Sequence, residues 1–115
     1  MIKPVINNTK PDFNALRKQD IEYMLNTDVF RSVANLPLKE ALTHYKELVA
    51  ETSYCVWVQC ETCEAFCREL VSKATKEELD WLENEWREKC HPSYICYGYY
   101  ESWVRTCYEV MKGIR

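Results

Sequence analysis

The amino-acid sequence predicts an all-α protein, a small bundle of about five helices. Glycine is scarce, with only Gly98 and Gly113 among 115 residues, so the chain lacks the residue that most tight turns and hairpins require. No proline or glycine interrupts residues 38–91. Apolar residues recur at intervals of three and four along most of the chain, which is the spacing of one face of a helix.

Size and composition predict a single soluble globular domain. The chain is 47% hydrophobic and 29% charged, and no apolar run approaches the length of a bilayer span, so we expect no membrane partner. Its formal charge of −3 argues against direct nucleic-acid binding. We expect a flexible arm over residues 1–10 and one helical domain over residues 11–115. The first residues lack the apolar core of a signal peptide, which favours a cytoplasmic location.

The first half of the domain is predicted to hold two shorter helices and one long helix. Pro11 can open a helix over residues 12–25, and a short helix is expected near residues 28–34. From Pro37, an apolar stripe predicts helix to about residue 73, either continuous or kinked near Thr52 and Ser53, although residues 54–58 are rich in strand formers. The stripe consists of Leu42, Tyr45, Val49, Thr52, Val56, Cys60, Cys63, Cys67, Leu70 and Ala74.

Two further helices are predicted in the second half. Thr75 and Glu78 have the spacing of a capping box, which predicts a helix over residues 76–90 with Leu79, Leu82 and Trp86 on its inner face. After Pro92, residues 94–112 form the last expected helix. Its apolar arc exceeds half of the helix circumference, so this helix either lies centrally or exposes one flank to a partner.

The outer face of the helix over residues 76–90 is the predicted partner-binding site. Trp81 lies nearly opposite the inner face, and the surrounding carboxylates are those of Glu77, Glu78, Glu85 and Glu88. A tryptophan among carboxylates has the chemistry of an interaction hot spot for a basic partner. The alternative is that the carboxylates form only a solvated face and that other helices cover Trp81.

A second predicted patch is tyrosine-rich. Tyr97, Tyr100 and Tyr108 follow one edge of the broad apolar arc of the last helix. Tyrosine supplies contact area at low entropic cost and a hydroxyl that can remain hydrated. The patch therefore suits a partner surface or a contact between copies of this chain, although a small core has the same composition.

The seven cysteines leave three interpretations open. Cys60, Cys63 and Cys67 share one helical face, where cysteine commonly packs as a small apolar side chain. The spacing of Cys60 and Cys63 also suits zinc, with later ligands from Cys90, His91, Cys96 or Cys107. Thirdly, Cys96 and Cys107 could form disulfides with a facing helix. No catalytic residue is expected, because a chain with two histidines and almost no glycine offers little for nucleophilic catalysis.

One segment resembles a known family. Residues 56–63, with Phe66, Arg68 and Leu70, are similar to the opening of CW-type zinc fingers, which read methylated lysine on histone tails. The resemblance implies that Cys60, Cys63, Cys96 and Cys107 hold zinc and that Trp57 lines an aromatic cage. The second tryptophan of the family is missing here, and a long charged segment separates Cys63 from Cys96.

The sequence as a whole predicts a small acidic, non-enzymatic protein that binds a partner with a basic surface as an inhibitor or adapter. Proteins that inhibit nucleic-acid enzymes by presenting carboxylates in place of phosphates, including phage and viral inhibitors, use such a surface. No cofactor is expected. The alternatives are a zinc-binding cysteine module that reads a peptide or nucleic acid, and a secreted, disulfide-stapled helical protein.

Overall fold

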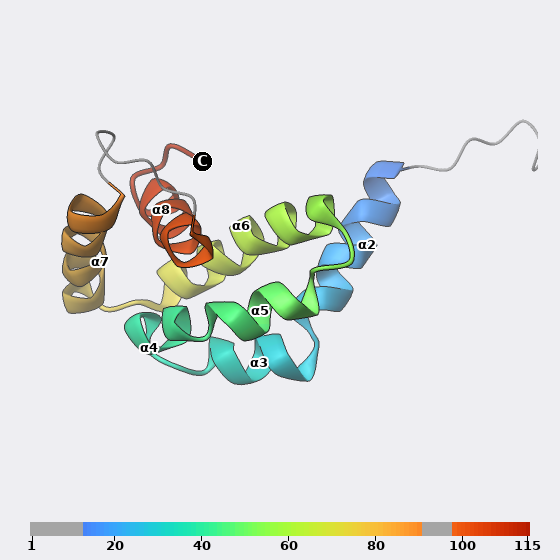
Figure 1. Cartoon of the computed structure of the whole chain (residues 1–115), viewed down its shortest axis with the longest axis horizontal. Coiled ribbons are helices and arrows are strands. Elements are labelled where there is room, and N and C mark those ends of the chain that lie inside the picture. Colours follow the sequence, from blue (N-terminus) through green and yellow to red (C-terminus); the bar gives the residue numbers. More distant parts are fainter. Residues whose placement is uncertain (1–12, 91–97) are drawn as a thin grey trace, which may run out of the picture.

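The protein is all-α, as the sequence predicts. A computed structural model describes residues 13–90 and 98–115, and within these residues there are seven helices and no strand (Figure 1). The helices are α2 (Phe13–Leu25), α3 (Asp28–Ala34), α4 (Leu38–Thr43), α5 (Tyr45–Glu51), α6 (Val56–Lys73), α7 (Lys76–Lys89) and α8 (Tyr99–Met111). The arm expected over residues 1–10 lies outside this part of the chain. Of the helices described, none combines the length and apolarity that crossing a bilayer requires.

The segment predicted as one helix from residue 37 to 73 is three helices, α4, α5 and α6. The first break is at His44, which ends α4 and begins α5. The second falls at the predicted kink: the Thr52 hydroxyl donates to the carbonyls of Leu48 and Val49, both at 3.2 Å. Hydroxyls that bond to preceding carbonyls compete with the helical pattern, and Cys55 then takes an extended conformation before α6 begins. This segment explains why the helix count exceeds five.

The second break also changes which face of α6 is buried. The inner face of α6 consists of Val58, Thr62, Phe66, Cys67 and Leu70. Val56 and Cys60, which the predicted stripe placed inward, are both exposed. The prediction for these two residues was wrong because it continued the helical phase of α5 through a segment that is not helical.

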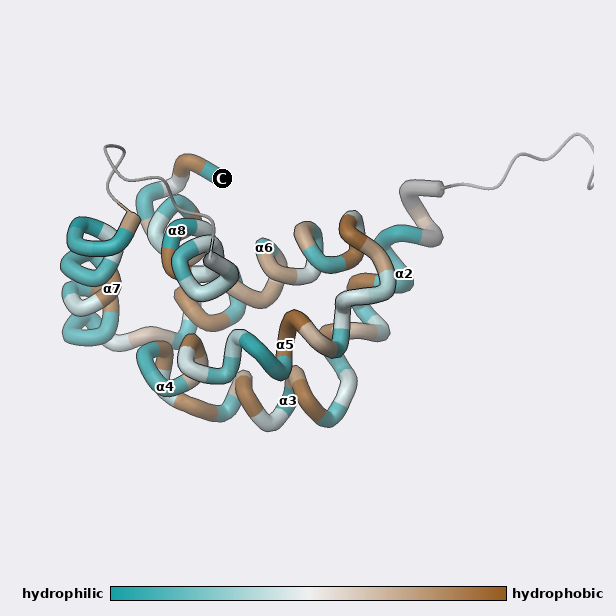
Figure 2. The backbone as a smooth tube through the Cα atoms, in the orientation of Figure 1, coloured by the Kyte–Doolittle hydropathy of each residue, from teal (hydrophilic) through white to brown (hydrophobic). Residues whose placement is uncertain are grey.

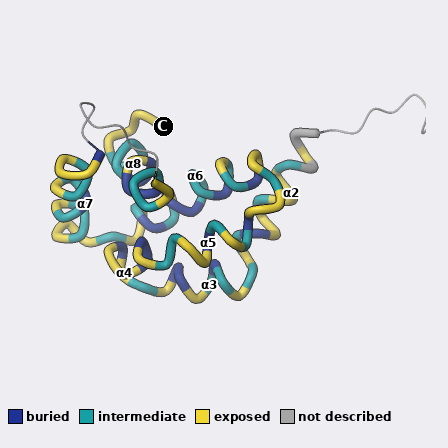
Figure 3. The backbone as a smooth tube through the Cα atoms, in the orientation of Figure 1, coloured by how far each residue is buried: buried dark blue, intermediate teal, exposed yellow. Residues whose placement is uncertain are grey.

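The core is centred on Phe66 of α6, which is fully buried. Its ring contacts that of Phe30 on α3 edge to face, with centroids 4.9 Å apart, and that of Trp103 on α8 at 6.1 Å. Edge-to-face pairs add to the free energy gained by burying the rings themselves. Phe66 thus joins α3, α6 and α8, and Figure 3 shows buried residues in each of these helices.

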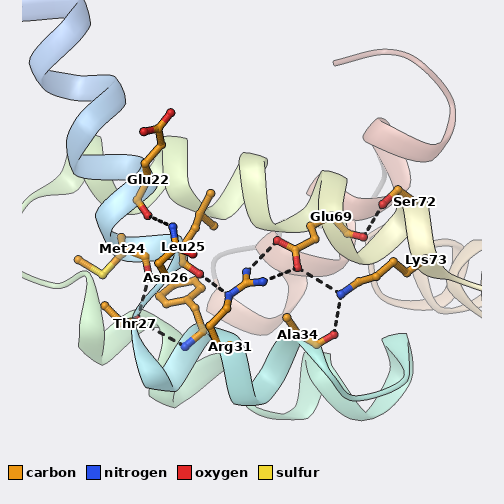
Figure 4. Close-up of polar contacts among 11 residues, drawn as sticks. Glu22, Met24, Leu25, Asn26, Thr27, Arg31, Ala34, Glu69, Ser72 and Lys73 are labelled. Carbon is orange, nitrogen blue, oxygen red and sulfur yellow. Dashed lines mark hydrogen bonds and ion pairs between the residues drawn. The ribbon is translucent and has the colours of Figure 1, made fainter.

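A network of hydrogen bonds and ion pairs links α3 to α6 beside this core (Figure 4). Arg31 donates two hydrogen bonds to the carboxylate of Glu69, at 3.0 and 2.8 Å, and a third to the carbonyl of Leu25 at 2.6 Å. Lys73 donates to Glu69 at 3.2 Å and to the carbonyl of Ala34 at 2.9 Å. A cation at the last residue of α3 also complements the negative end of the helix dipole.

Candidate functional site

Helix α7 begins with the predicted capping box, which is confirmed. The N–H of Glu78 donates to the Thr75 hydroxyl, and the N–H of Thr75 donates to the Glu78 carboxylate, both at 3.2 Å. The same carboxylate accepts a hydrogen bond of 2.7 Å from the backbone N–H of Leu38, at the start of α4. These backbone donors, that of Leu38 first, lower the pKa of Glu78. Glu78 therefore links α7 to α4 besides lying in the predicted acidic face.

Trp81, the predicted hot spot of α7, is half-buried. It packs against the edge of the core, and the Lys39 ammonium lies 5.8 Å from the centre of its ring. An ammonium over an indole face is a favourable cation–π arrangement. One side of Trp81 is consequently used within the molecule, and its role in partner binding stays a prediction.

Glu85 is a second predicted carboxylate with partners inside the molecule. The Tyr100 hydroxyl of α8 donates a hydrogen bond to the largely buried Glu85 carboxylate, and Lys89 lies 3.8 Å from it. Burial, reinforced by the nearby carboxylate, raises the pKa of Tyr100 above its ordinary value of 10.0. Two of the four predicted carboxylates, Glu77 and Glu88, are exposed to solvent, on a helix that is largely hydrophilic (Figure 2).

The two described tyrosines of the second predicted patch contact different aromatic side chains. Tyr108 stacks on Trp86 of α7 with ring centroids 4.0 Å apart and an angle of 4° between the rings. The Tyr100 ring contacts that of Tyr45 on α5, with centroids 5.6 Å apart. Tyr97 lies outside the described residues. Tyr100 and Tyr108 therefore contribute to helix packing, and whether they also meet a partner stays a prediction.

An aromatic surface that the sequence analysis did not identify lies where α2 meets the start of α6. Four large apolar side chains are exposed there: Tyr23 (72%), Tyr54 (67%), Val56 (69%) and Trp57 (63%). Among the described residues, only Tyr99 and Ile114 are comparable. We call these four residues the aromatic end; in Figure 1 it lies opposite α7 along the molecule. Tyr23 is close enough to Tyr54 to affect its ionisation, and exposed apolar side chains that lie close together are typical of binding surfaces.

The aromatic end has an acidic rim. Arg17 lies over the Trp57 ring, 4.5 Å from its centre, and pairs with Glu61 at 3.2 Å. Asp20 is close enough to Tyr54 to help raise its pKa, after the larger effect of burial. Asp28 and Glu51 line an open hollow beside Tyr23. These contacts place four carboxylates and one guanidinium around the aromatic end.

The three cysteines of α6 differ in exposure, so the core-packing interpretation holds for only part of the set. Cys60 is exposed, Cys63 is half-buried and Cys67 is fully buried. The Cys67 thiol lies 3.8 Å from the carbonyl of Trp103, and the thiols of Cys63 and Cys107 are beside it. Burial, followed by these neighbouring thiols, raises the pKa of Cys67 well above 9.0.

The zinc and disulfide interpretations gain no support from the described residues. Within them, no three His, Cys, Asp or Glu side chains are grouped so as to hold a metal ion. Of the residues that the zinc interpretation names, Cys60, Cys63, Cys90 and Cys107 belong to the part of the chain that the structure describes, whereas His91 and Cys96 lie outside it. Of the described cysteines, Cys55, Cys60, Cys63, Cys67 and Cys107 are free thiols. Trp57, the cage residue implied by the CW-type resemblance, packs against Arg17 on the surface.

Comparisons with protein-family models, with curated proteins and with solved structures give no significant match to this chain.

Proposed function

We propose that this protein is a non-enzymatic binding protein that docks on the basic surface of a partner protein, as an inhibitor or adapter. The observation that carries the proposal is the aromatic end with its acidic rim. It has the chemistry that the sequence analysis assigned to Trp81, but it offers four exposed apolar side chains in place of one half-buried indole.

Trp57 is the proposed anchor of this surface. Tryptophan contributes to interaction hot spots more than most residues, because it buries a large apolar area with few rotatable bonds. The Arg17 guanidinium on its ring and the Glu61 carboxylate beside it hold polar groups around the indole. This is the arrangement of an apolar anchor inside a polar rim.

The charge of the rim supports a basic partner. Asp20, Asp28, Glu51 and Glu61 outnumber Arg17, and the whole chain has a formal charge of −3. Carboxylates around an interface raise the rate of association with a positively charged surface. They lower the rate of association with an acidic surface. Nucleic-acid enzymes present such a surface to phosphates, so an inhibitor of one of them is the specific form of the proposal.

The experiment uses a photo-crosslinking amino acid placed at Tyr54 in the full chain, and a matched one placed at Trp81. A protein that becomes crosslinked to the amino acid at position 54 is identified and purified. Its binding to the unmodified chain is then measured by titration. We expect Trp57→Ala to weaken binding by about thirtyfold, corresponding to roughly 2 kcal/mol, and added salt to weaken it further.

Because Trp57 is largely exposed, Trp57→Ala should leave the fold intact, and the circular dichroism spectrum provides that control. The matched control variant is Glu77→Lys combined with Glu88→Lys, which changes the two exposed carboxylates of α7. If that variant abolishes binding and Trp57→Ala has no effect, the aromatic end is not the docking site and the surface of α7 is. Competition by duplex DNA for the purified partner tests whether the protein covers a phosphate-binding surface.

A further inference from the structure

A pocket of about 240 Å³ lies between α6, α8 and the last residue of the chain, next to the α6 turn that carries Trp57 and Glu61 of the proposed docking surface. Its lining includes Gln59, Cys60, Cys63, Tyr99, Arg105 and Arg115. Two cations and two thiols line this pocket, and no carboxylate side chain of the described residues does so. In a chain with more acidic than basic residues, this is a local reversal of charge.

The two arginines differ in their availability. Arg115 is already paired, with Glu109 at 3.3 Å and Glu64 at 3.9 Å. Arg105 is exposed, and no ion pair to a described residue occupies its guanidinium. Arg105 is therefore the cation available to an incoming anion.

The acidic residues nearest to Cys60 along α6 are each balanced by a cation. Glu61 pairs with Arg17 at 3.2 Å, and Glu64 pairs with Arg68 at 3.3 Å. On α8, Glu101 and Glu109 lie four residues on either side of Arg105, and Glu109 pairs with Arg115 at 3.3 Å. The lining of the pocket carries two arginines and no carboxylate of a described side chain, so an anion that enters it meets Arg105 beside the Cys60 thiol. We propose that Cys60 is a thiolation site for small disulfides that carry carboxylates, such as those of the glutathione class.

The reaction is a thiol–disulfide exchange. The Cys60 Sγ attacks one sulfur of the reagent R–S–S–R, so a new Sγ–S bond forms and the S–S bond of the reagent breaks. Cys60 is oxidised to a mixed disulfide, and the other half of the reagent leaves as a thiolate, which takes up the proton that Cys60 has lost. Arg105 attracts the carboxylate of the reagent during this step.

The mixed disulfide should persist, although Cys63 is only three residues away. Both cysteines lie well inside α6, where side chains three residues apart have Cβ atoms about 5–6 Å apart. A disulfide requires a Cβ separation of about 3.5–4.5 Å. Cys63 can therefore displace the adduct only if α6 unwinds, which separates this site from a redox-active CxxC pair.

The test follows the reaction of the native full chain with two aromatic disulfides, the anionic reagent dithiobis(nitrobenzoate) and the neutral reagent dithiodipyridine. We expect peptide mapping to place the first adduct on Cys60, and Cys60→Ser to remove the fastest phase. Arg105→Gln removes one positive charge from the lining of the pocket, so it should slow the anionic reagent about three- to tenfold and leave the neutral reagent unchanged.

Arg87→Gln on α7 is the matched control, because it removes the same charge far from the pocket, and it should change neither rate. Three results would overturn the proposal: a first adduct on another cysteine, an equal effect of Arg105→Gln on both reagents, or a Cys60–Cys63 disulfide without an adduct.

Discussion

Arg31 and Glu69 form a bidentate ion pair that joins α3 to α6, with N–O distances of 3.0 and 2.8 Å. The hydrogen bonds from Arg31 are the largest cause of the lowered pKa of Glu69, and Lys73 adds to them against the opposing effect of burial. The folded state thus favours the ionised carboxylate, which links stability to pH.

The free energy of unfolding should fall in acid as Glu69 becomes protonated. A pKa lowered on folding stabilises the protein above the unfolded value of about 4.5, and this stabilisation is lost as pH falls through the lowered pKa. Glu69→Gln should cost roughly 1 kcal/mol at neutral pH, since the pair is solvent-accessible but bidentate. Urea unfolding between neutral pH and pH 3 measures both effects. Glu77→Gln is the control, and an unchanged acid dependence in Glu69→Gln would contradict the assignment.

Thr75→Ala should destabilise the protein by about 1 kcal/mol, because α7 loses the hydroxyl that accepts the Glu78 N–H. Thr75→Ser retains a hydroxyl at that position and should restore most of the loss. The midpoint of urea unfolding, at unchanged slope, reports the difference. Equal losses in the two variants would mean that the capping hydrogen bond contributes little.

Phe66→Ala should cost about 3–5 kcal/mol, because it leaves a cavity where three helices meet and removes both edge-to-face contacts. Val56→Ala on the same helix is the exposed counterpart and should change the stability by less than about 0.5 kcal/mol. Thermal unfolding followed by circular dichroism separates them. Similar losses in the two variants would place the buried face of α6 elsewhere.

The thiols should react with iodoacetamide in an order set by burial. Cys60 is exposed, whereas Cys67 and Cys107 are fully buried and should be modified only on unfolding. In denaturant without reductant, at least five thiols should be titrated, because Cys55, Cys60, Cys63, Cys67 and Cys107 are free. A count of one would instead indicate the disulfide-stapled alternative.

Local signals in the sequence predicted much of the fold. Pro11, and the pairing of Thr75 with Glu78, placed the starts of α2 and α7 within a residue or two, because proline and capping boxes act on their own turn. The face of α6 could not be obtained in this way. Four non-helical residues, 52–55, separate α5 from α6, and they rotate the buried face away from Val56 and Cys60.

The candidate site was harder to predict, because its character depends on contacts between distant segments. Spacing placed Glu78 and Glu85 on the outer face of α7, but it could not show that the Leu38 N–H and the Tyr100 hydroxyl bind them. The aromatic end likewise exists only because α2 folds back beside the start of α6. Its one signal in the sequence is that Tyr54 and Trp57 fall outside the apolar stripe.

The parallel rings of Trp86 and Tyr108 provide α7 and α8 with a built-in optical reporter. Two chromophores at a centroid distance of 4.0 Å are close enough to exchange excitation, so the near-ultraviolet dichroism and the indole emission should both change when these helices separate. Assembly of the carboxyl-terminal helix pair can then be followed in real time without a label, and replacing Trp57, which lies against Arg17 of α2, removes the indole that would report on α2.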